Sequence, residues 1–207
     1  SLTSYAAGGM DVGPVQAFYG QSVFVPLGYV LFCPLLAMRS LAEERRSGTA
    51  ELLLSSPLSA ANIVLGKYLA LGLTYVGMWV PTLVYPFVLR GTGQVEWAVV
   101  ATTYLGVVGL GLGFLSVGLL ASAVTSNQLL AATLAGTVIF GLALCGVGTQ
   151  LVPEGPLHEL FSHLSIQATL TECAQGILSL RRLVYLVTLI GLTQVLTIGA
   201  VERWRTT

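Results

Sequence analysis

Five hydrophobic runs, each long enough to cross a lipid bilayer, constrain the fold of this chain more than any other feature. They cover about Ser22–Met38, Ile63–Leu89, Trp97–Val124, Leu129–Val152 and Leu183–Trp204. A hydrocarbon core of about 30 Å needs roughly 20 residues of α-helix. None of the runs shows the apolar–polar alternation of a membrane β-strand. Because a helix satisfies its own backbone hydrogen bonds in lipid, the sequence predicts five transmembrane helices.

The composition agrees with a chain that is solvated by lipid. Hydrophobic residues make up 55% of the 207 residues and charged residues only 9%, whereas about a quarter of a soluble domain is charged. The net charge is zero, so the chain lacks the basic surface with which proteins bind nucleic acid. We therefore predict an all-α, polytopic transmembrane helix bundle that contacts membrane lipid and no nucleic acid.

The distribution of Lys and Arg predicts how the bundle is oriented. Five spans put Arg39, Arg45, Arg46, Lys67, Arg203 and Arg205 on one side of the membrane and Arg90, Arg181 and Arg182 on the other. The positive-inside rule assigns the first side to the cytoplasm. Residues 1–21, which have no signal-peptide pattern, are then external. An external start of this kind predicts one more span before Ser1.

The connection between the first two spans holds the densest charge in the chain. Residues 39–46 favour a helix that continues the first span into water, and Ser47-Gly48 interrupts it. Thr49 can cap a second, short helix, which Ser56-Pro57 ends. Ser59 can cap the helix of the second span. The sequence thus predicts a rigid elbow of helix, short helix and helix on the cytoplasmic side.

A solvated loop with positive-inside charges is the simpler interpretation of this segment. It accounts for Arg45 and Arg46, but the positive-inside rule does not require three acidic residues and two helix caps as well. A surface that contacts a partner protein accounts for the acidic residues and for the two caps. The apolar side of the short helix would then fill a groove of that partner. The candidate contact residues are Glu43, Glu44, Arg45, Arg46, Gly48, Thr49, Glu51, Leu52, Leu53 and Leu54.

Small residues are frequent in the third and fourth spans. Gly109 and Gly113 form a GxxxG pair in the third span. Such residues let helix backbones approach closely, which replaces the hydrophobic drive that lipid cannot supply. The pair is assigned to helix packing within one bundle, and a subunit interface or a moving seam is the alternative.

The sequence has no recognisable set of catalytic or metal-binding residues. His158 and His163 are five positions apart, about 140° around a helix, so they do not share a face as the ligands of a helical zinc site do. We read their segment as a surface helix that dips its apolar side into the external interface. No P-loop and no nucleophile–base set is evident. We expect no catalytic residues and no metal or other cofactor on this chain.

The three cysteines do not form a recognisable framework. Cys33 and Cys145 fall in hydrophobic runs, and Cys173 falls in a polar stretch that we expect to be a loop. An odd count without metal-ligand spacing argues against both a disulfide framework and a metal site. Cys33 and Cys145 are predicted to be small, buried apolar residues.

Two motifs resemble those of a known family. Residues 44–57, ERRSGTAELLLSSP, followed by IVLGK at 63–67, resemble the signature of ABC-2 type transporter permeases, and are closest to the gliding-motility-like and nitrous-oxide-accessory branches. Residues 160–163 and 175–185, with a last span ending at 202–204, resemble the external re-entrant segment and final helix of the same family. The resemblance covers nearly the whole chain.

The resemblance implies six spans in a permease half that works in a pair and is driven by a cytoplasmic ATP-binding subunit. The coupling helix maps onto Gly48–Ser56, with Glu43 and Glu44 at its approach. ATP and Mg²⁺ would be bound by the partner ATPase, and the pair would form with a second copy or a homologue in a bacterial inner membrane. One membrane domain, 1–207, then comprises an external loop 1–21, spans 22–42, 59–89, 97–124, 129–152 and 181–205, the coupling elbow 43–58 and an external amphipathic segment 153–180.

Two functions of different classes remain open at this point. The first is a permease that moves an apolar or amphipathic substrate with ATP hydrolysed by its partner. The alternative is a mechanotransmitter that relays the motion of the ATPase to an external partner protein without moving a solute. An intramembrane enzyme is disfavoured because candidate catalytic residues are missing.

Overall fold

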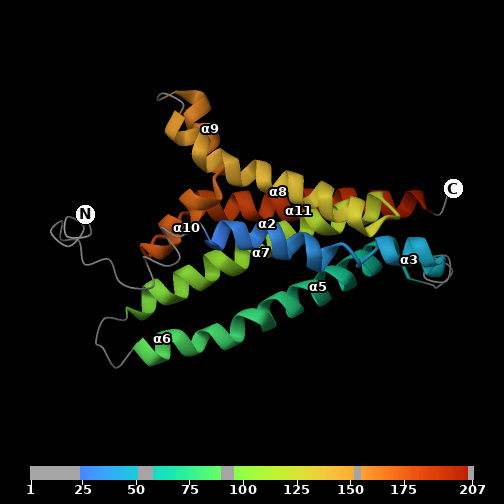
Figure 1. Cartoon of the computed structure of the whole chain (residues 1–207), viewed down its shortest axis with the longest axis horizontal. Helices are drawn as coiled ribbons and strands as arrows, with labels where there is room; N and C mark the ends of the chain where they lie inside the picture. The colour runs from blue at the N-terminus through green and yellow to red at the C-terminus, as the bar shows by residue number, and fades with distance from the viewer. Residues whose placement is uncertain (1–23, 51–57, 90–95, 152–154, 205–207) are drawn as a thin grey trace.

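A computed structural model of the chain describes residues 24–50, 58–89, 96–151 and 155–204 (Figure 1). Within these ranges the regular structure is helical and contains no strand. Its elements are α2 (Phe24–Ala37), α3 (Ala42–Ser47), α5 (Ala60–Trp79), the 3₁₀ turn η1 (Val80–Leu83), α6 (Val84–Leu89), α7 (Trp97–Val124), α8 (Gln128–Leu151), α9 (Pro156–Leu164), α10 (Ile166–Ala174) and α11 (Leu180–Arg203).

Five helical stretches are long and apolar enough to cross a membrane. They are Phe24–Ser47, Ala60–Val88, Trp97–Val124, Gln128–Gly146 and Leu180–Arg203. The prediction of an all-α polytopic bundle with five spans is therefore confirmed. Figure 1 shows α3 and the end of α11 at the same end of the bundle, as the four crossings between them require.

Helix α7 is the centre of the bundle. About 67% of its most apolar window is buried within the chain, against 17–33% for the other four spans. Helices α2, α5, α8, α10 and α11 all pack against it. The buried core accordingly gathers around Val107, Leu110, Phe114 and Leu115. The outer helices leave large apolar side chains exposed, as a bundle that faces lipid does.

Glycines of α7 set how closely its neighbours approach. A Cβ added at Gly109 or Gly113 would lie 3.1 or 3.2 Å from a leucine of α11, so this pair lies at the α7–α11 contact within one chain. A Cβ at Gly111 would lie 2.1 Å from the ring of Tyr75 of α5. The bare backbone there lets the Tyr75 hydroxyl donate to the carbonyl of Val107 at 3.3 Å.

Gly118 is the glycine whose replacement has least room to relax. An added Cβ would lie 2.5 Å from the Cβ of Ala37 on α2, and neither atom can rotate away. We expect Gly118→Ala to push α2 off α7 and to lower the free energy of unfolding by about 1–3 kcal/mol. Gly141→Ala on α8 is the matched control, because nothing lies within 4 Å of its added Cβ. Equal unfolding midpoints for the two variants in detergent would contradict this packing.

The second span is continuous but changes pitch at a proline. Pro81 lies in η1, and its missing N–H interrupts the α-helical hydrogen-bond series between α5 and α6. Thr82 donates to the carbonyl of Trp79 at 2.6 Å, and Tyr104 of α7 donates to the carbonyl of Thr82 at 2.9 Å. These side chains supply additional donors to backbone carbonyls at the change of pitch.

The described residues between the fourth and fifth spans form two helices, α9 and α10. Helix α10 packs against α7, where Thr102 donates to the carbonyl of Cys173 at 2.9 Å. Cys173 is buried on α10 and Cys33 is buried on α2, whereas Cys145 is partly buried. The expectation that Cys173 lies in a polar loop is therefore wrong, because the apolar face of a short amphipathic helix carries it into the bundle.

Arg182 ties this segment to the last span. Its guanidinium donates to both carboxylate oxygens of Glu172 on α10, at 3.2 and 2.9 Å, and to the carbonyl of Ser162 on α9 at 2.8 Å. The Arg182 side chain is only 9% exposed. One buried cation thus fixes α9 and α10 to the start of α11, so it serves packing in addition to any effect on orientation.

Candidate functional site

Helix α3 is the part of the predicted elbow that the structure describes most fully, and a serine of α7 holds its start. The Ser122 hydroxyl accepts from the backbone N–H groups of Leu41 and Ala42, at 3.0 and 2.9 Å, and donates to the carbonyl of Met38 at 3.1 Å. No side chain of α3's own N-cap residue caps it. Ser122 therefore caps α3 from another helix.

This capping explains a difference from the expected helix. We predicted that the first span would continue unbroken through residues 39–46, but α2 ends at Ala37 and α3 begins at Ala42. Residues 38–41 form a turn in which Ser40 N–H bonds to the Ala37 carbonyl at 3.1 Å. The Ser122 hydroxyl satisfies backbone groups that the break exposes, which makes the break tolerable at a membrane boundary.

Arg45 connects α3 to the ends of two further spans. Its Nη1 donates to the carbonyl of Val124, the last residue of α7, at 3.3 Å. Its guanidinium also lies 5.4 Å from the ring centroid of Trp204, which follows α11. A cation over an indole ring at an exposed site contributes about 0.5–1 kcal/mol. The residue thus joins the elbow to the cytoplasmic-side ends of α7 and α11 in the predicted orientation.

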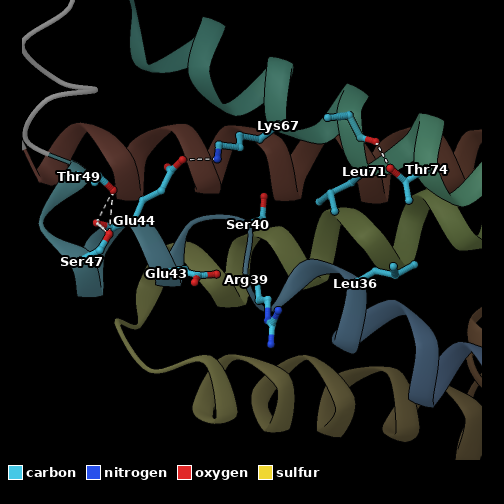
Figure 2. A pocket seen from close by; sticks show the side chains of 11 residues that line it. Leu36, Arg39, Ser40, Glu43, Glu44, Ser47, Thr49, Lys67, Leu71 and Thr74 are labelled. Carbon is cyan, nitrogen blue, oxygen red and sulfur yellow. Dashed lines mark hydrogen bonds and ion pairs between the residues drawn. The ribbon is translucent and has the colours of Figure 1, made fainter.

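Glu44 connects α3 to the second span. Its Oε1 forms an ion pair and hydrogen bond with Lys67 Nζ of α5 (Figure 2). The two side chains are 23% and 30% exposed, so solvent screens this pair less than a surface ion pair. In the sequence, Lys67 contributed to the orientation of the bundle and to the IVLGK motif, and it was not predicted to pair with Glu44. Its position 23 residues from Glu44 gave no local signal of pairing.

The break after α3 lies where the sequence predicts it. Gly48 has φ of 75°, a left-handed conformation that favours glycine. The Ser47 and Thr49 hydroxyls each donate to the Glu44 carbonyl at 3.3 Å, and they lie 2.9 Å from each other. On the second span, Ser59 caps α5 as predicted, accepting from Asn62 N–H at 3.2 Å.

Two predicted contact residues take no part in this anchoring. Glu43 and Arg46 are exposed, and neither has an ion-pair or hydrogen-bond partner for its side chain among the described residues. They contrast with Glu44 and Arg45, which hold α3 to other helices. The structure therefore divides the predicted contact residues into anchors within the chain and side chains open to a partner.

Four of the predicted contact residues lie outside the described part of the chain: Glu51, Leu52, Leu53 and Leu54. The short helix that Thr49 was expected to cap was predicted to include these residues, and Thr49 and Ala50 are helical at the edge of the described range. The role of this short helix stays a prediction.

Sequence reasoning missed Ser122 and Trp204. Ser122 lies in an otherwise apolar run near the elbow end of α7, and a hydroxyl in a span that bonds across helices is a recognised means of helix association. That signal was present but unspecific. Trp204 was read only as the end of a span, because nothing in the sequence brings residues 45 and 204 together.

A cavity of about 400 Å³ lies between the elbow and the second span. Its lining comes from the end of α2, the turn after it, α3 and α5, and it includes Arg39, Ser40, Glu43, Glu44 and Lys67. Figure 2 shows Glu44 and Lys67 reaching toward each other across this space, while Arg39 points away from them. The cavity therefore has the Glu44–Lys67 ion pair on one side and the guanidinium of Arg39 on another.

One comparison with known proteins gives a match. The profile of a family described as ABC-2 family transporter protein matches residues 11–169. No curated protein and no solved structure matches the chain. The matched residues include α3, the Glu44–Lys67 pair and Ser122, and they end within α10.

Proposed function

Because this chain belongs to the ABC-2 type transporter permease family, we propose that its elbow receives the motion of a cytoplasmic ATPase and passes it to the spans. The family is one of membrane subunits that associate with ABC ATPases. In this proposal the ATPase holds ATP and Mg²⁺, and a second copy or a homologue completes the permease. We also propose that the membrane is a bacterial inner membrane. Within the family, the motifs favour the gliding-motility-like and nitrous-oxide-accessory branches.

The anchoring of α3 is the observation that carries this proposal. Ser122 holds α3 to α7, Glu44 holds it to α5 through Lys67, and Arg45 holds it to the end of α11 at Trp204. A helix that is fixed to several spans transmits a displacement to each of them, whereas an unanchored loop would absorb it. Glu43 and Arg46 are left to contact the ATPase.

The character of the spans supports an apolar or amphipathic substrate. In the described parts of the five spans, charged residues occur only toward the ends, as Lys67 and Arg182 do. Intramembrane charges mark ion and proton pathways, so the bundle offers little to a polar or ionic solute. An amphiphile could instead move along the apolar helix faces with its polar part near the charged ends.

Charge reversal of the two exposed residues tests the docking surface. We expect Glu43→Arg and Arg46→Glu each to weaken capture of the copurifying ATPase about tenfold, or about 1.4 kcal/mol, because a like charge would replace an attractive one. ATP turnover of the reconstituted complex should fall with it. The unfolding midpoint should stay unchanged, since neither side chain has a described partner.

Glu202→Arg supplies the matched control. Glu202 is an exposed acidic residue near the same end of the bundle but on α11, and its reversal should leave ATPase capture intact. Equal weakening by all three variants would count against the elbow as the docking surface. ATP turnover in liposomes that depends on an added external partner, with no lipid or solute moved, would instead favour the mechanotransmitter.

A further inference from the structure

The cavity between the elbow and α5 changes from apolar to charged along its length. Figure 2 shows Leu36 and Leu71 toward the middle of the bundle, with Glu44 and Lys67 at the elbow end. Its volume of about 400 Å³ lies in the range of small-molecule sites. A gradient of this kind suits an amphiphile whose polar head lies at the elbow and whose chains extend into the bilayer.

The charged end has unused capacity to accept hydrogen bonds. Glu44 Oε1 is paired with Lys67, but Oε2 is buried and has no donor among the described residues. Glu43 lines the same cavity, and its carboxylate also has no described partner. A buried carboxylate oxygen without a donor costs free energy. A ligand with N–H donors would remove that cost.

The same cavity has an unused cation on another side. Arg39 lines it, and its guanidinium has no ion-pair or hydrogen-bond partner among the described side chains. Figure 2 shows it pointing away from the Glu44–Lys67 pair. A guanidinium binds a phosphate through two parallel N–H···O bonds. The Glu44 acceptor for an ammonium and the Arg39 donor for a phosphate therefore occur in one cavity but apart from each other, and Figure 2 draws Glu43 on the side of Arg39.

These observations select the charge of the ligand. The lining carries two cations, Arg39 and Lys67, and two carboxylates, Glu43 and Glu44, so their formal charges cancel. An anionic headgroup would meet both carboxylates, and a simple cation would meet Arg39. A zwitterion satisfies both sides. A trimethylammonium group has no N–H to give to Glu44 Oε2, whereas a primary ammonium has three.

We propose that this cavity binds the ethanolamine phosphate headgroup of a membrane phospholipid. When the Glu44 carboxylate turns to bring its buried Oε2 to the cavity, the ammonium donates to this oxygen and to Glu43, and the phosphate accepts from Arg39. The acyl chains leave past Leu36 and Leu71 into the bilayer, which is why a lipid fits better than a free zwitterion. The site is independent of whether the chain moves this lipid or only retains it.

Lipid binding to the purified complex tests the site without nucleotide. Because Glu43 belongs to both proposals, the Arg39 variant, which changes no proposed docking residue, separates its outcome from that of the ATPase-capture experiment. Native mass spectrometry would count phosphatidylethanolamine, phosphatidylcholine or phosphatidylglycerol retained by the full chain with its partner subunits. We expect phosphatidylethanolamine to bind about tenfold more tightly than the others. Arg39→Gln or Glu43→Gln should each weaken binding of phosphatidylethanolamine about tenfold, the usual effect of losing one charge-assisted hydrogen bond.

Two pairs of controls separate the cavity from general lipid contact. Arg46→Gln and Glu202→Gln remove exposed charges near the same end of the bundle but outside the cavity lining, and both should leave the preference intact. Ala70→Phe would fill the cavity without changing its charge, whereas Leu69→Phe changes a neighbouring side chain that does not line it. Only the Ala70 variant should lose the bound lipid.

Three results would overturn the proposal. The first is equal retention of phosphatidylcholine and phosphatidylethanolamine. The second is equal loss of lipid in the cavity variants and in their controls. The third is displacement of the lipid by soluble O-phosphoethanolamine at equal concentration, which would assign the site to a small zwitterion and not to a lipid.

Discussion

Replacing Ser122 with Ala is expected to release α3 from the bundle while the spans themselves stay folded. The change removes the acceptor of the Leu41 and Ala42 N–H groups and the donor to the Met38 carbonyl. Because Ser122 is fully buried, water does not readily replace these bonds. We expect a local loss of about 2–3 kcal/mol, in the range for buried groups left unsatisfied.

Amide hydrogen exchange at Leu41 and Ala42 measures this loss of local stability. An opening free energy lower by about 2–3 kcal/mol would make the Leu41 and Ala42 amides exchange roughly 30 to 150 times faster. Coupled ATP hydrolysis should fall, because α3 would no longer move together with α7. Thr133→Ala is the control, since that exposed hydroxyl donates only to Leu130 of its own helix. Unchanged exchange at Leu41 and Ala42 would show that Ser122 does not hold the elbow.

Replacing Arg182 with Gln is expected to detach α9 and α10 from the last span. Glu172 would lose its cation and the Ser162 carbonyl would lose its donor. Removing one partner of a buried ion pair costs about 3–5 kcal/mol. We expect about 3 kcal/mol, the lower end, because the Glu172 side chain is already 35% exposed.

Reaction of Cys173 with a maleimide in a Cys145→Ser background measures this detachment. Cys173 is buried on α10, and about 3 kcal/mol corresponds to reaction roughly a hundredfold faster. Burial raises the pKa of the Cys173 thiol, the charge of Glu172 raises it further, and Arg182 lowers it. Loss of Arg182 alone would therefore reduce the thiolate fraction and slow the reaction. Faster labelling can only reflect opening of α10.

Arg181→Gln is the matched control for this experiment. Arg181 is the exposed neighbour of Arg182 in the chain, and its replacement should leave Cys173 protected. Protection in the Arg182 variant would contradict the role of Arg182 as the residue that fixes α9 and α10. Equal labelling in both variants would assign the effect to positive charge at the start of α11 and not to the buried pair.

Much of the elbow could be predicted because its signals are local. Gly48 adopts the left-handed conformation that the Ser-Gly step suggested, and Ser59 caps α5 as its position before a helical run indicated. A cap or a break depends on a few consecutive residues, so the sequence carries it directly. The turn at residues 38–41 was missed because its stabilising hydroxyl comes from residue 122, far along the chain.

The apolar runs by themselves determined that this chain is a helical bundle with five spans, because lipid leaves the backbone no other partner for its hydrogen bonds. Only the tertiary structure decided that α7 lies at the centre, that Arg182 is buried with Glu172, and that Ser122, Lys67 and Trp204 meet α3. The physical reason is that hydrophobicity specifies the solvent of a helix but not its neighbours. In lipid the neighbours are chosen by close packing at small residues and by a few polar pairs, whose partners are distant in sequence.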